Sequence, residues 1–109
     1  KLILILGIMS DKDIPEILKP LLPLASDIIF TAPKYDRATS PKKLSEYALS
    51  IGYPSIVTDS VKEALEKGFE IKERYTSPLI LITGSFYTIG EAMEALGETA
   101  ILGRLREKI

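Results

Sequence analysis

The chain has 109 residues, of which 46% are hydrophobic and 27% charged, a balance typical of a single globular domain. Its 14 basic and 15 acidic residues are dispersed, so the charge pattern predicts no nucleic-acid-binding surface. Cysteine and histidine are both absent, which excludes disulfides, thiol catalysis and the commonest general base and metal ligand.

Apolar runs predict four strands, taken here in chain order. Three segments are continuously apolar, which is typical of parallel strands covered on both faces. They are Leu2 to Leu6, Ile28 to Phe30 and Leu79 to Ile82. Ser55 to Thr58 is a weaker fourth strand. No apolar run approaches the ~20 residues that a membrane span needs. We therefore expect a soluble, cytoplasmic protein without a membrane partner.

Helices are predicted in the segments that follow each strand. Two of these segments carry apolar residues at helical spacing: Leu44, Tyr47, Ala48 and Ile51, and Ile89, Ala92, Met93 and Leu96. Paired side chains with capping spacing predict the helix starts: Asp13 with Glu16, Ser40 with Pro41, Ser60 with Glu63, and Thr88 with Glu91. Gly68 and Gly97 are natural helix ends, and Pro20 and Pro23 should end or kink the first helix.

This alternation predicts a single α/β domain over residues 1–109, with a Rossmann-like, mainly parallel sheet and helices on both faces. Ligands of such sheets bind beyond the carboxyl ends of the strands. The residues that follow Leu6, Phe30, Val57 and Ile82 are therefore the most informative. Because an apolar strand begins almost directly after Lys1, we expect the chain to be an excised piece.

The segment after the first strand runs from Gly7 to Asp13. Gly7 allows a sharp turn, and the ammonium group of Lys12 could meet an anion at the sheet edge. The alternative is a capped turn in which Asp11, Lys12 and Asp13 are merely solvated.

The loop after the second strand, Thr31 to Ala38, carries Arg37. Its planar guanidinium could bind a carboxylate, although a structural ion pair with Asp36 or Asp27 is an equal alternative.

After the fourth strand, Gly84 permits close backbone approach and Ser85 lies where free amides and a hydroxyl could bind an anion. Ser85 or Thr88 could instead be a simple N-cap, with Phe86 and Tyr87 as packing aromatics. Without a histidine to activate it, Ser85 is not a candidate nucleophile. The sequence also lacks a phosphate loop and a Gly-x-Gly-x-x-Gly fingerprint. We therefore predict no catalytic residue, no metal ligand and no independent nucleotide site.

Three segments together resemble the carboxy-terminal domain of the folylpolyglutamate synthase/dihydrofolate synthase family, which belongs to the Mur ligase superfamily. They are Gly7-Ile-Met-Ser-Asp-Lys-Asp13, Ala32 to Ala38 with its Arg-Ala pair, and Thr83-Gly-Ser-Phe-Tyr-Thr88. The resemblance implies an ATP- and magnesium-dependent ligase of folate metabolism, which phosphorylates a folate or dihydropteroate carboxylate and joins the acyl phosphate to glutamate. An N-terminal ATPase domain of the same protein would supply the nucleotide site.

The resemblance also implies a set of glutamate-binding residues. Lys12 and Ser85 match positions that contact the glutamate carboxylates, and Arg37 matches a motif position. Asp11, Gly84 and Tyr87 accompany them in the same motifs. The family has a further strand ending in Asp-Gly-Ala-His-Asn, then a helix, before the segment that matches Leu2 to Leu6. This chain lacks both, so we expect it to bind no cofactor and to be inactive alone.

Two other functions remain open from the residues. The chain could be a free-standing ligand-binding or regulatory module, although a receiver-like domain would need a lysine where Gly84 and Ser85 follow the last strand. It could also be a structural interaction domain, anchored by exposed Phe86 and Tyr87.

Overall fold

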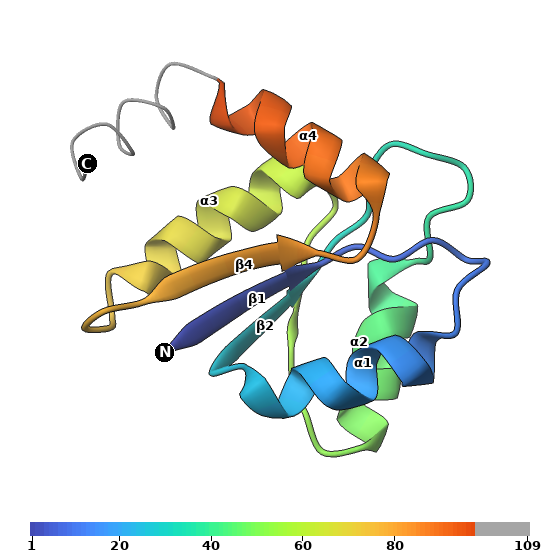
Figure 1. Cartoon of the computed structure of the whole chain (residues 1–109), viewed down its shortest axis with the longest axis horizontal. Coiled ribbons are helices and arrows are strands. Elements are labelled where there is room, and N and C mark those ends of the chain that lie inside the picture. Colours follow the sequence, from blue (N-terminus) through green and yellow to red (C-terminus); the bar gives the residue numbers. More distant parts are fainter. Residues whose placement is uncertain (98–109) are drawn as a thin grey trace.

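A computed structural model describes residues 1–97 of the chain (Figure 1). Strands and helices alternate, as predicted. The elements in order are β1 (Leu2–Leu6), α1 (Ile14–Leu21), the short 3-10 helix η1 (Leu22–Leu24), β2 (Asp27–Phe30), α2 (Pro41–Ser50), β3 (Ile56–Val57), α3 (Val61–Lys72), β4 (Leu79–Thr83) and α4 (Phe86–Leu96). None of the helices in this part of the chain is long and apolar enough to cross a membrane.

The four strands form one sheet in the order β3-β2-β1-β4, and all neighbouring strands are parallel. Leu6 of β1 pairs with Phe30 of β2 and with Thr83 of β4, and Phe30 pairs in turn with Val57 of β3. The carboxyl ends of the strands are therefore level. The loops that follow them all leave from the same edge of the sheet.

Helices cover both faces of this sheet, which confirms the predicted fold class (Figure 1). Side chains of successive strand residues point to opposite faces. Leu4 and Leu6 accordingly pack in a core with residues of α1 and α2. Ile3 and Ile5 pack in a second core with residues of α3 and α4. Because β1 is buried on both faces, its sequence is a continuous apolar run rather than an alternating one.

Most of the predicted helix boundaries are confirmed. Asp13 accepts a hydrogen bond from the Glu16 amide, and Gly97 is the C-cap of α4. Ser60 accepts from the Glu63 amide in the same way at the start of α3. Helix α1 continues only one residue beyond Pro20 before η1 begins, so the first helix is short, as expected.

Two boundary predictions were wrong. Gly68 does not end a helix but lies inside α3, where an added Cβ would be 3.1 Å from the Ile5 side chain. Its lack of a side chain lets the helix approach the sheet closely. Thr88 does not cap α4, because Ser85 takes that place three residues earlier and Thr88 lies in the first turn. Glu91, the expected capping partner of Thr88, accepts a hydrogen bond from the Lys34 amide instead.

Candidate functional site

The loops after β1 and β2 are joined to each other beyond the sheet edge. Met9 and Ala38 form an isolated antiparallel bridge, in which the Ser10 amide donates to the Arg37 carbonyl at 2.6 Å. The Thr39 amide donates to the Ile8 carbonyl at 2.8 Å. These backbone bonds hold the segment that carries Lys12 beside the segment that carries Arg37.

The loop after β4 is packed against the first loop through two glycines. Gly84 has a φ of 114°, a conformation that favours glycine, and a Cβ there would lie 2.6 Å from the Gly7 carbonyl oxygen. The close approach predicted for Gly84 therefore exists, and its partner is the backbone of Gly7. This contact brings the start of α4 to the same edge as the other two loops.

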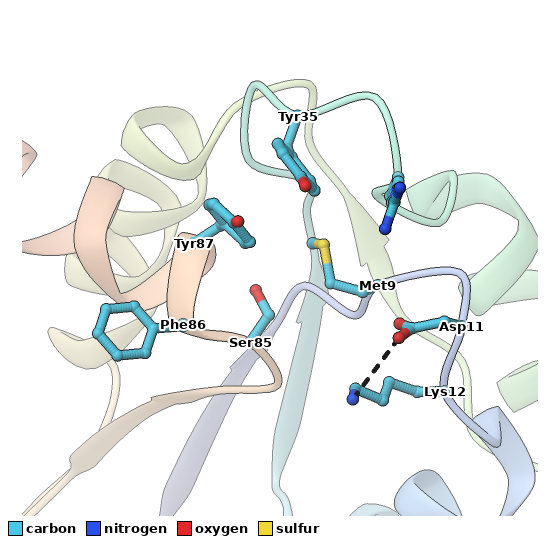
Figure 2. A pocket seen from close by; sticks show the side chains of 8 residues that line it. Met9, Asp11, Lys12, Tyr35, Ser85, Phe86 and Tyr87 are labelled. Carbon is cyan, nitrogen blue, oxygen red and sulfur yellow. Dashed lines mark ion pairs between the residues drawn. The ribbon is translucent and has the colours of Figure 1, made fainter.

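All three loops line one open pocket of about 300 Å³ (Figure 2). Its lining consists of Met9, Asp11, Lys12, Tyr35, Arg37, Ser85, Phe86 and Tyr87. Five of the six residues predicted to bind substrate are in this set. The sixth, Gly84, is not part of the lining but shapes the turn beneath Ser85.

The two cations of the pocket have different surroundings. Lys12 forms an ion pair with Asp11 at 3.8 Å, and both side chains are more than half exposed (Figure 2). Such a solvated pair is weak, so an incoming anion can displace Asp11. Within residues 1–97, Arg37 forms no ion pair with Asp27 or Asp36. Asp27 instead accepts a hydrogen bond from Tyr75.

Ser85 is both a pocket residue and the N-cap of α4. The alternative that its side chain caps a helix is therefore confirmed. Its hydroxyl oxygen accepts from the Thr88 amide at 2.9 Å and lies 2.7 Å from the Thr88 hydroxyl. Thr88 donates its only hydroxyl proton to the Gly7 carbonyl, 2.9 Å away. Ser85 must therefore donate to Thr88, since a hydroxyl has one proton. A ligand carboxylate would have to compete for that proton.

The wall of the pocket contains a stacked aromatic pair that the sequence did not reveal. The rings of Tyr35 and Tyr87 are 4.0 Å apart at 13° (Figure 2). Hydrogen bonding to Tyr35 raises the pKa of Tyr87 above its ordinary value. Tyr35 and Met9 were not singled out from the sequence. Tyr35 belongs to the Arg37 loop, but no local pattern links it to a partner on α4.

The chemistry of this pocket suits a small anionic ligand. Lys12 and Arg37 supply two positive charges against the single carboxylate of Asp11. The first-turn amides of Phe86 and Tyr87 have no carbonyl partner within α4, and the helix dipole favours negative charge at this end. No group of three or more acidic, histidine or cysteine side chains within residues 1–97 could hold a metal ion. Among these described residues, the pocket therefore offers no such cluster for the magnesium ion implied by the resemblance.

Comparisons with known proteins give a clear result only for structure. No family model matches the sequence, and no curated protein does. A structure of Mycobacterium tuberculosis folylpolyglutamate synthase with ADP and AMPPCP matches 89% of this chain at a TM-score of 0.80 and 24% identity. The bifunctional folylpolyglutamate synthase/dihydrofolate synthase of Yersinia pestis, with AMPPNP and a Mn ion, matches 90% at 0.78 and 23% identity.

The chain spans about a quarter of the length of these solved structures, 24% of the first and 22% of the second. At this level of identity the likeness establishes the fold. The chain thus has the α/β fold found in one part of these ligases, and that is the fold expected from its sequence.

Proposed function

We propose that this chain is the amino-acid-binding part of an ATP-dependent ligase that adds L-glutamate to a folate or dihydropteroate carboxylate through an acyl phosphate. The observation that carries the proposal is the meeting of three loops around one pocket. These loops contain the three segments that resemble the ligase family, and they come from widely separated parts of the sequence. The shared fold of two folylpolyglutamate synthases supports the same function.

Glutamate would use both kinds of charge in the pocket. We assign its two carboxylates to Lys12, Arg37 and the free amides at the start of α4. Asp11, once displaced from Lys12, could meet the ammonium group. Ser85 would join by turning its proton from Thr88 to a carboxylate, at the cost of one internal hydrogen bond. Tyr87 and Gly84 would shape the wall and the turn around the ligand.

The phosphorylation step belongs to residues outside this pocket. ATP, magnesium and the folate carboxylate would be held by an N-terminal ATPase domain, which would close over the pocket and exclude water from the acyl phosphate. The pocket is open to solvent, so a second surface is needed to enclose a bound amino acid. The isolated chain should bind glutamate weakly and catalyse nothing.

The direct test is a titration of the isotope-labelled chain with L-glutamate, followed by NMR. We expect amide shifts at residues 11–12, 37 and 84–87, with a dissociation constant on the order of millimolar for half a site. Lys12→Ala and Arg37→Ala should each weaken binding about tenfold or more, a loss typical of a charge-assisted contact. Lys43→Ala is the matched control, because Lys43 is an exposed cation on α2 outside the pocket.

L-Glutamine and glutarate separate glutamate recognition from general anion binding. Glutamine lacks the second carboxylate and glutarate lacks the ammonium group, so both should bind more weakly than glutamate. Shifts that are scattered over the surface, or equal for all three compounds, would contradict the proposal. In an intact ligase containing this domain, Lys12→Ala and Ser85→Ala should raise the KM for glutamate far more than the KM for ATP.

A further inference from the structure

The loop between β2 and α2 carries Arg37 into the candidate pocket, yet the tip of this loop lies outside the core. Residues 34–37 are all exposed, whereas Pro33 and Thr39 on either side of them are buried. Exposed loop backbone is ordered only where specific contacts hold it. The backbone bridge at Ala38 holds the end of the loop that follows Arg37. Whatever holds the end that precedes Arg37 therefore decides where its guanidinium lies.

Helix α4 contacts the first half of this loop at two neighbouring points. The Glu91 carboxylate accepts a hydrogen bond from the Lys34 amide at 2.6 Å. The Tyr87 ring stacks on the Tyr35 ring, with the ring centroids 4.0 Å apart (Figure 2). Tyr87 and Glu91 are four residues apart on α4, so they lie on the same face of the helix. One face of α4 thus holds two consecutive loop residues, and we call this pair of contacts the α4 clamp.

Two tight turns connect the α4 clamp to Arg37. The Tyr35 amide donates to the Pro33 carbonyl at 2.8 Å, which closes the first turn around Lys34. The Ala38 amide donates to the Tyr35 carbonyl at 3.0 Å, which closes the second turn. Arg37 is an inner residue of this second turn. The α4 clamp therefore fixes the start of the turn that carries Arg37, and the bridge at Ala38 fixes its end.

We propose that Glu91 is a positioning residue for glutamate binding, an inference that rests on the proposed function. By holding the Lys34 amide, Glu91 keeps Arg37 beside the start of α4, so that both can bind one ligand. Glu91 does not line the candidate pocket but a separate polar hollow, together with Lys34 and Ser60. It therefore acts through the loop and not by touching the ligand. A loop that is ordered before binding loses less entropy when the ligand binds, so the α4 clamp strengthens binding.

The positioning role and a simple charge effect predict opposite results when Glu91 is replaced. A nearby carboxylate repels an anionic ligand, so its removal would strengthen glutamate binding if charge alone mattered. Glu91→Ala should instead weaken glutamate binding about three- to tenfold, the value of one lost hydrogen bond. Glu91→Gln keeps an oxygen that can accept from the Lys34 amide, so it should retain binding within about twofold. Glu94→Ala is the matched control, because it removes the same charge from an exposed position of α4 and should not weaken binding.

An NMR titration with L-glutamate measures these affinities, and amide hydrogen exchange of the ligand-free chain tests the α4 clamp separately. The Lys34 amide should exchange about three- to tenfold faster in Glu91→Ala than in the wild type or Glu94→Ala. Circular dichroism should show every variant to be folded, since alanine and glutamine are good helix formers. If the wild type binds glutamate and Glu91→Ala binds it equally well, or Glu94→Ala weakens binding as much, the positioning role is overturned. Absence of binding by the wild type would overturn the proposed function, and equal exchange at Lys34 in wild type and Glu91→Ala would overturn the clamp by itself.

Discussion

Replacing Gly84 by alanine should be among the most damaging single-methyl changes in this protein. Gly84 joins β4 to α4 with a φ of 114°, and an added Cβ would lie 2.6 Å from the Gly7 carbonyl oxygen and 3.1 Å from the Gly7 carbonyl carbon. Both atoms belong to the backbone at the end of β1, which is bonded to its neighbours on either side. The clash cannot be relieved by rotating a side chain, so the loop itself has to move.

The size of the effect follows from two separable costs. A non-glycine residue in this region of φ costs about 1–2 kcal/mol. Forcing a methyl group into a packed backbone contact adds about 1–3 kcal/mol. The expected loss is therefore about 3–4 kcal/mol, against a total of about 5–15 kcal/mol for a domain of this length.

Urea denaturation followed by circular dichroism measures this loss. With an m-value of about 1.5 kcal/mol/M, the midpoint of Gly84→Ala should fall by about 2 M with the slope unchanged. Gly52→Ala is the matched control, because Gly52 has a φ of 96° but no atom within 4 Å of the added Cβ. It should lose only the conformational cost of about 1–2 kcal/mol. If the two variants lose the same stability, the contact between Gly84 and Gly7 is not the cause.

Three further predictions concern single contacts. Thr88→Val should lower the free energy of unfolding by about 1–3 kcal/mol, because the buried Thr88 hydroxyl donates to the Gly7 carbonyl. Urea unfolding measures this change, and a loss below about 0.5 kcal/mol, the scatter of neutral surface changes, would refute the prediction. Tyr35→Ala should remove a stack worth about 0.5–1.5 kcal/mol beyond its area and weaken glutamate binding. Tyr35→Leu should show both losses as well, because leucine has no ring to stack on Tyr87. Hydrogen bonding to Asp27 raises the pKa of Tyr75, so the bond stabilises the fold below about pH 10 and is lost as pH rises through the folded-state pKa. The stability difference between wild type and Tyr75→Phe should accordingly shrink in alkaline solution, and a difference independent of pH would argue against the bond.

From the sequence, the residues of the candidate site could be placed at one edge of the sheet, but their contacts with one another could not be predicted. Asp11, Lys12 and Arg37 could be placed at one edge because parallel strands of a wound sheet end on the same side. The stack of Tyr35 on Tyr87 could not, since the two residues meet only when the second loop folds over the start of α4. For Ser85 the sequence left two alternatives, N-cap or anion-binding residue, and in the structure Ser85 caps α4 and also lines the pocket.

The sequence by itself determined the fold class of this protein, because the period and length of its apolar segments are local properties. A continuous apolar run such as Leu2–Leu6 predicts a strand of a parallel sheet. Tertiary structure alone decided the position of each strand and the use of each glycine. Leu79–Ile82 is as apolar as β1, but the prediction that it is covered on both faces was wrong. It lies in the edge strand β4, where Leu79 and Leu81 are exposed, since burial depends on what packs beside a strand. Gly68 was a natural helix end by its residue type, but close packing of α3 on Ile5 required it in mid-helix.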